Sequence, residues 1–193
     1  MNIAAFLSYV LVTTFTPGPN NIMSMSNANK YGFRKTLKFI FGVSAGFAVI
    51  MLLCSYFNLI LFKYIPKVEL VMSIIGGVYM VYLAVKIMTS KSHDEQDNKH
   101  KNISFVSGLV LQFINPKVIL YGITTISTFI IPSYRSSFSL LLFSLFLAFV
   151  GFLATSCWAL FGALFQKFLA KYRKPFNLAM GLLLIYSALS LFY

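Results

Sequence analysis

Long apolar stretches alternate with short polar connections along the whole chain. The apolar stretches fall at residues 3–29, 38–62, 68–88, 104–131, 138–165 and 175–193. Because a helix needs about 20 apolar residues to cross a bilayer, this pattern predicts six transmembrane helices and an all-α membrane protein.

The longest polar connection divides the chain into two halves of three predicted helices each. We expect a first three-helix repeat at 1–88, a linker loop at 89–102 and a second three-helix repeat at 103–193. Three is an odd number, so the second half enters the membrane from the opposite side. This arrangement is a 3+3 inverted-topology repeat, a plan that many secondary transporters share.

Charge adds an orientation to this pattern. Only 10% of the 193 residues are charged, against about 25% in soluble domains, and the net charge is +12. The basic residues cluster in the first, third and fifth connections, and lysine and arginine stay on the cytoplasmic side of membranes. We therefore expect a multi-pass protein of the cytoplasmic (inner) membrane, with both termini outside and the 89–102 loop inside. This distribution indicates a lipid bilayer as the partner and excludes a nucleic-acid-binding face.

The first predicted helix is interrupted near its middle. Its centre reads, in order, Thr16, Pro17, Gly18, Pro19, Asn20 and Asn21. Two prolines remove two backbone donors and clash with the preceding turn, and the glycine lets the chain bend. No continuous helix passes through this segment.

The fourth predicted helix is interrupted at a similar depth, by Asn115, Pro116 and Lys117. Backbone groups without partners cannot face lipid, and they are tolerated only where they line a protein cavity or water. We therefore expect both breaks, one per repeat, to meet at a central site. The alternative is a pair of ordinary proline kinks.

The breaks carry polar chemistry. A new helix starts after Pro19, and the free N–H groups of its first turn favour an anion such as a carboxylate. Lys117 is the only charged residue deep in a predicted helix, which makes it a functional candidate. The alternatives are that Lys117 snorkels to the surface, or that carbonyls of the first half-helix neutralise it. Gln112 and Asn115 share a face of the same helix at a spacing of i, i+3.

Together these groups predict a substrate-binding site for a small neutral zwitterion. The helix start and Lys117 would hold the carboxylate of the substrate. Asn20, Asn115 and the carbonyls freed by the prolines would accept from its ammonium group. No acidic residue lies in the middle of a predicted helix, so the site offers no carboxylate to pair with the side chain of a cationic substrate such as lysine.

Other candidates carry less weight. Tyr79 and Tyr82 of the third predicted helix could reach the cavity, pack or lie at the membrane interface. Gly42 and Gly46 are spaced for close helix contact, which serves packing within the chain or a homodimer equally well. The histidines and acids of the 89–102 loop fit no rigid metal site, and we expect neither a metal nor a cofactor.

The ordered motifs resemble those of the LysE/RhtB family of amino-acid exporters. They begin with Thr16-Pro17-Gly18-Pro19-Asn20, followed by Gly32-Phe33-Arg34 and Gly42-x-x-x-Gly46. The likeness is closest to the branch that exports cysteine and O-acetylserine, and it includes 17–22, 51–54, 83–90, 111–117, 119–122, 127–129 and 157–160. The resemblance implies six spans and export of cysteine, O-acetylserine and similar neutral amino acids, driven by the proton gradient.

The chain departs from many members of that family in its second predicted helix. Phe47 stands near Gly46, where those members carry an acidic residue, so coupling through a carboxylate is in doubt. Lys117 is then a candidate proton carrier, because a buried lysine loses its proton readily.

A membrane thiol–disulfide carrier is the alternative function. Cys54 and Cys157 lie in the second and fifth predicted helices, which are corresponding positions of the two halves. Neither cysteine adjoins a proline, a charge or a second cysteine that would activate its thiol. This alternative makes the protein an oxidoreductase, whereas the exporter is not an enzyme.

Overall fold

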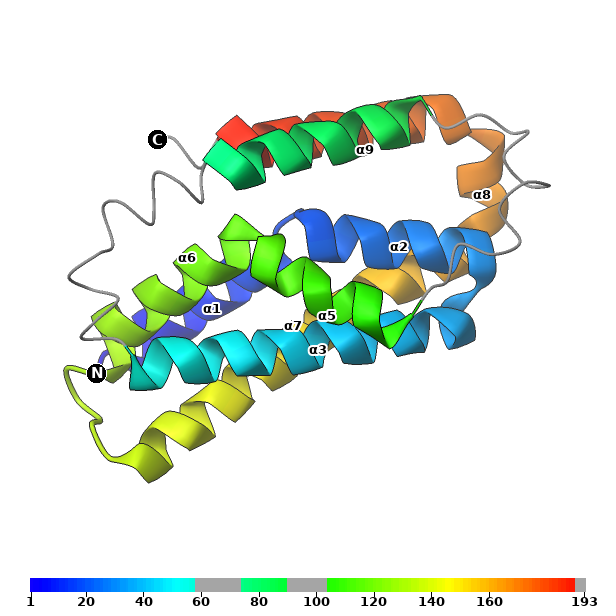
Figure 1. Cartoon of the computed structure of the whole chain (residues 1–193). Helices are drawn as coiled ribbons and strands as arrows, with labels where there is room; N and C mark the ends of the chain where they lie inside the picture. The colour runs from blue at the N-terminus through cyan, green and yellow to red at the C-terminus, as the bar shows by residue number, and fades with distance from the viewer. Residues whose placement is uncertain (58–73, 90–103, 190–193) are drawn as a thin grey trace.

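The computed structural model describes residues 1–57, 74–89 and 104–189, which are all helix, turn or short connection (Figure 1). The helices of this part are α1 (Ile3–Phe15), α2 (Pro19–Tyr31), α3 (Phe33–Tyr56), a helix at Ile74–Met88, α5 (Phe105–Ile114), α6 (Pro116–Thr125), the π-helical turn η2 (Ile126–Ile130), α7 (Ser137–Leu164), α8 (Gln166–Lys171) and α9 (Arg173–Leu189). The all-α class is confirmed.

Local caps explain several of the helix starts. The side chains of Asn2, Ser104, Asn115 and Ser136 each accept a hydrogen bond from a backbone N–H of the helix that follows. Proline occupies the first position of α2 and of α6, where its missing N–H costs nothing.

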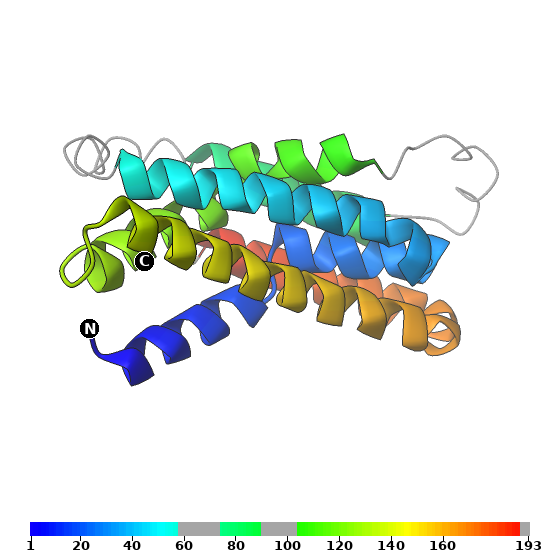
Figure 2. The same ribbon diagram turned by 90° about the horizontal axis from the view of Figure 1, so that it is seen from below.

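The long helices α3 and α7 form the centre of the bundle. Both are apolar and long enough to span a membrane. They pack on each other, and each holds one inner half-helix, α5 on α3 and α2 on α7 (Figures 1 and 2). The two broken helices are therefore joined through the central pair of helices α3 and α7.

Glycines bring α3 and α5 into close contact. A Cβ atom on Gly42 would overlap the carbonyl of Phe105, and one on Gly46 would lie 2.7 Å from the carbonyl oxygen of Leu109. On the facing helix, a Cβ on Gly108 would overlap the carbonyl of Phe39. The predicted small-residue contact is thus confirmed as packing within the chain.

The structure confirms both predicted breaks. The first break separates α1, which ends at Phe15, from α2, which begins at Pro19. The second break is Asn115, where the path of α5 bends by 66° into α6 and η2.

Helices Ile74–Met88 and α9 lie side by side, packed through Gly181, where a Cβ atom would overlap Met88 (Figure 1). The pair rests on the broken helices. A Cβ on Gly76 would overlap the ring of Pro116, and Leu184 packs in a core cluster with Ile22.

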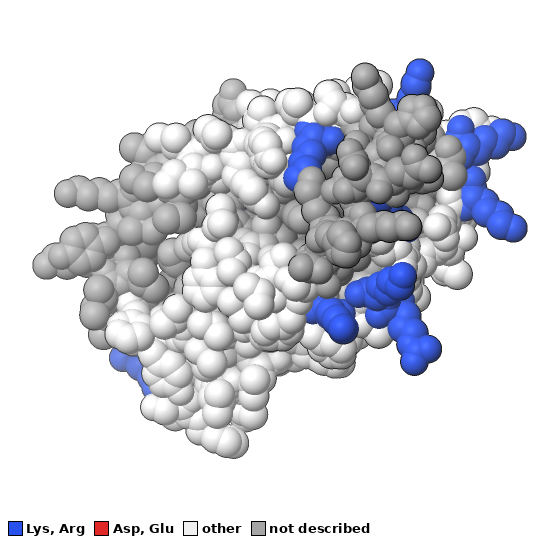
Figure 3. Space-filling view, turned by 45° about the vertical axis from the view of Figure 1, so that its right-hand side comes forward, with Lys and Arg blue, Asp and Glu red and all other residues white. Residues whose placement is uncertain are grey.

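Basic side chains gather at one end of the molecule (Figure 3). This end holds the α2–α3 junction and α8, with Lys30, Arg34, Lys35, Lys38, Lys167 and Lys171. The described residues include two helices long enough to span a membrane, or three when the bent pair α5–α6 counts as one. Six spans in a 3+3 inverted repeat therefore stay a prediction, and the linker at 90–102 lies outside the described residues.

Candidate substrate site at the two helix breaks

The first break changes the hydrogen-bond partners of eight backbone groups. In a continuous helix the carbonyls of residues 13–17 would accept from the N–H groups of residues 17–21. Pro17 and Pro19 have no N–H, and the chain turns away between α1 and α2. The break therefore leaves five carbonyl oxygens and three N–H groups in need of other partners.

All five carbonyl oxygens accept hydrogen bonds from side chains. Asn21 of α2 donates to the carbonyls of Thr14 and Thr16, at 2.9 and 3.0 Å. Thr16 Oγ1 donates to the carbonyl of Thr13, and the indole N–H of Trp158 on α7 donates to the carbonyl of Phe15. Lys117 of α6 donates to the carbonyls of Thr16 and Pro17. Ser187 of α9 also donates to the carbonyl of Pro17. Side chains from four helices, α2, α6, α7 and α9, thus provide hydrogen-bond donors for the carbonyls at the end of α1. Lipid could not supply such donors.

The three N–H groups are left open. The backbone N–H groups of Gly18, Asn20 and Asn21 have no acceptor within the part of the chain that the structure describes, and Gly18 supplies no side-chain cap. All three residues line a cavity. The start of α2 is therefore a set of free donors at the positive end of a helix dipole.

The second break differs from the first. Asn115 accepts from the N–H of Lys117 through Oδ1, at 3.2 Å, and from the N–H groups of Val118 and Ile119 through its backbone carbonyl. The start of α6 is thus closed by its own cap. Only the first break offers open donors.

Amide side chains connect the two breaks. Asn20 and Gln112 exchange two hydrogen bonds, at 2.8 and 3.1 Å, and Asn115 donates to the same Asn20 oxygen at 3.0 Å. Gln112 and Asn115 are almost fully buried. This amide group fixes α2 against the α5–α6 junction.

The Lys117 ammonium binds the end of α1. It donates to Thr16 Oγ1 at 2.7 Å, to the Thr16 carbonyl at 3.0 Å and to the Pro17 carbonyl at 3.3 Å. An ammonium has three donors, so these contacts use all of them. The side chain passes directly over Gly18, where a Cβ atom would lie 3.2 Å from Lys117 Cδ.

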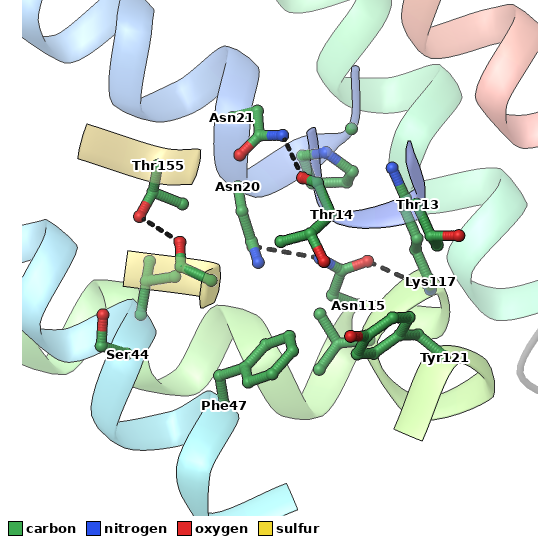
Figure 4. A pocket seen from close by; sticks show the side chains of 15 residues that line it. Thr13, Thr14, Asn20, Asn21, Ser44, Phe47, Asn115, Lys117, Tyr121 and Thr155 are labelled. Carbon is green, nitrogen blue, oxygen red and sulfur yellow. Dashed lines mark hydrogen bonds between the residues drawn. The ribbon is translucent and has the colours of Figure 1, made fainter. Parts of the chain in front are cut away.

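The cavity lies between the breaks and the central helices, and has a volume of about 40 Å³ (Figure 4). Its walls combine polar groups from the breaks with apolar groups from α3 and α6, notably Phe47 and Tyr121. The remaining lining residues are Thr13, Thr14, Gly18, Pro19, Asn20, Asn21, Val43, Ser44, Asn115, Lys117, Val118, Gly151 and Thr155. A water needs about 10–15 Å³ of such space, so the cavity holds about three waters and must widen for an amino acid.

The hydroxyls of Thr14 and Tyr121 are buried in the cavity wall, where they lie close to each other but form no hydrogen bond of good geometry within the described residues. Buried polar groups are normally paired, so these hydroxyls indicate a place for water or a polar ligand. The Tyr121 ring stacks on Tyr9 with centroids 6.0 Å apart, which fixes its position.

The structure brings most of the predicted site residues together. Gly18, Pro19, Asn20, Asn21, Asn115 and Lys117 line the cavity, while Thr16, Pro17 and Gln112 bind lining residues. Tyr79 and Tyr82 are outside the lining; Tyr79 packs in the core clusters beside α9, and Tyr82 is exposed. Sequence reasoning missed Thr13, Thr14, Phe47 and Tyr121 as lining residues, because their position depends on packing between distant helices.

Both cysteines lie in the described residues, and both are free thiols. Cys54 is buried in the core cluster of α3, α6 and α7, whereas Cys157 is exposed on α7. Neither cysteine lines the cavity.

Comparison with known proteins identifies the family. The LysE type translocator domain matches residues 11–193. The chain belongs to the LysE family of translocators. A cysteine/O-acetylserine efflux protein of Escherichia coli O139:H28 is 41% identical over 99% of this chain and 97% of its own length. Those of Escherichia coli K12 and Shigella flexneri serotype 5b are each 40% identical over the same shares.

These relatives are efflux proteins, and the family consists of transporters rather than enzymes. Membership of this family and the apolar helices indicate a membrane transporter. No solved structure matches the chain significantly.

Proposed function

We propose that the protein exports small neutral amino acids, such as cysteine and O-acetylserine, across the cytoplasmic membrane. The relatives named for efflux of these two compounds match the chain over nearly its whole length. The observation that carries the site is the set of N–H groups of Gly18, Asn20 and Asn21 at the first helix break, which have no acceptor in the described residues and belong to residues that line the cavity.

The substrate carboxylate binds these N–H groups. A helix N-terminus favours an anion, and half-helix N-termini hold anionic substrate groups in several transporter folds. The Lys117 side chain adds a positive charge to the same wall. The hydroxyls of Thr14 and Tyr121 are available for the ammonium or the side chain of the substrate.

The charge of the cavity favours a zwitterion over a cation. All four acidic residues of the sequence lie at 69 and 94–97, outside the described residues, so the described cavity wall includes no carboxylate. A cationic side chain would meet Lys117 without a compensating anion, which disfavours lysine and arginine as substrates.

Export requires the small cavity to open to each side in turn, as in a 3+3 inverted repeat with both termini outside. We propose that the proton gradient drives this cycle and that Lys117 is the candidate proton carrier. Transport by Lys117→Gln measured at several pH values tests this role. An unchanged rate and pH dependence would remove Lys117 from the coupling mechanism.

Counterflow in proteoliposomes tests the function. We expect exchange of labelled cysteine and O-acetylserine, with weaker exchange of homoserine and threonine and almost none of lysine. A protein that exchanges lysine as fast as cysteine would refute the charge argument. A protein that exchanges no amino acid would refute the proposed function.

A further inference from the structure

The end of α1 is built as a binding site for a cation. Three oxygen atoms, the Thr16 and Pro17 carbonyls and Thr16 Oγ1, converge on one point at 2.7–3.3 Å. Carbonyl oxygens at a helix C-terminus carry the negative end of the helix dipole, which attracts positive charge. The Lys117 Nζ atom lies at that point.

The cation is held without a carboxylate from the described part of the chain. The described residues contain no aspartate or glutamate, and the other described basic side chains are on helix ends or connections. Within the described residues, neutral oxygens therefore bind the Lys117 ammonium. Coordination of a cation by unwound backbone carbonyls is a general device of broken membrane helices.

The contact also joins two distant parts of the chain. Lys117 and Thr16 are 101 residues apart, and their bonds tie the first turn of α6 to the end of α1. The Lys117 chain reaches the oxygens by passing over Gly18, which has no side chain to block it.

We propose that the end of α1 is a cation-binding site for a primary ammonium group, occupied in the native protein by the side chain of Lys117, and that the bound cation locks the two helix breaks together. Lys117 is then a positioning residue. It holds the open start of α2 in place rather than bonding the substrate in this conformation.

Chemical rescue tests the site directly. Lys117→Ala removes Cγ, Cδ, Cε and Nζ, which together correspond to one propylammonium ion. We expect the purified Lys117→Ala protein in detergent to melt at a lower temperature than the native protein. Propylammonium should restore at least half of that loss in a saturable manner, whereas methylammonium should restore less, because binding stabilises only the folded state that forms the site.

Four controls separate this site from nonspecific effects. Propanol has the same shape without the charge, and tetramethylammonium has the charge without N–H donors, so neither should rescue. The native protein and Lys86→Ala should not respond to propylammonium, because Lys86 is an exposed lysine on another helix. Equal responses of all three proteins, or no response of Lys117→Ala to any cation, would overturn the proposal.

A second set of variants, at Thr16, tests the site if the Lys117→Ala protein does not fold. Thr16→Val removes one of the three oxygens, together with the hydrogen bond that Thr16 Oγ1 donates to the Thr13 carbonyl, and Thr16→Ser keeps both, so only Thr16→Val should lower the melting temperature. Equal melting of Thr16→Val and the native protein would contradict the site. Both measurements follow stability alone, so the proposed transport function can fail without affecting this inference, and the reverse also holds.

Discussion

Asn20 and Gln112 exchange two hydrogen bonds between the two helix breaks, although 92 positions separate them in the chain. Asn115 adds a third bond to the same Asn20 oxygen. A buried amide that loses its partner costs about 1–3 kcal/mol, because it cannot return to water. This group therefore holds the relative position of the two breaks.

We expect Asn20→Ala to lower the free energy of unfolding by about 1–3 kcal/mol, since it leaves two buried amides without their partner. Denaturation in mixed micelles of detergent and SDS measures this loss. Asn29→Ala is the matched control, because Asn29 lies on the same helix and its side chain has no hydrogen bond within the described residues. An equal loss for both variants would show that the amide contacts contribute nothing specific.

Gly42→Ala is expected to destabilise the protein by about 1–3 kcal/mol, the usual cost of an overpacked contact. The added methyl would overlap the carbonyl of Phe105 at the crossing of α3 and α5. Gly151→Ala provides the comparison, because its Cβ would lie 3.8 Å from the Phe47 ring, an ordinary contact distance. The same unfolding assay should show a loss only for Gly42→Ala, and an unaffected Gly42→Ala protein would mean that the two helices separate without cost.

Gly151→Ala should instead change the choice of substrate. Gly151 faces Phe47 in the cavity, so the new methyl reduces the space for the substrate side chain. One methyl in a pocket is worth about 1–3 kcal/mol, and we expect the ratio of O-acetylserine to cysteine transport to fall about tenfold. Competition counterflow with the two labelled compounds measures the ratio. An equal reduction for both compounds would place the substrate side chain elsewhere.

Replacement of both cysteines, Cys54→Ala with Cys157→Ser, is expected to leave cysteine counterflow within about twofold of the native rate. Neither thiol lines the cavity, and Cys54 is buried in an apolar cluster where a thiolate is disfavoured. Loss of counterflow in a variant that remains folded would revive the thiol–disulfide alternative.

Local chemistry made the breaks predictable from the sequence. Pro17, Pro19 and Pro116 each remove a backbone donor, and this effect depends on no distant residue. The close approach of Gly42 and Gly46 to a neighbouring helix was equally predictable from their spacing, although the partner, α5, was not.

The direction of the Lys117 side chain was left open by the sequence, because a lysine at a break can serve a ligand, snorkel or bind carbonyls. The structure places its ammonium on the carbonyls of α1. Tyr121 and Phe47 reach the cavity only because α6 packs against both α1 and α3, which no periodicity in the sequence reveals. Long-range packing therefore limits what could be predicted about the site.

Gly18 has an extended backbone, with φ at −173°, that any amino acid can adopt. The local fold thus leaves position 18 free, and the demand for glycine comes from the lysine chain that crosses it. Substitutions at positions 18 and 117 should therefore be correlated. In sequences that descend from this chain, a larger residue at position 18 is expected to occur together with a shorter residue at position 117.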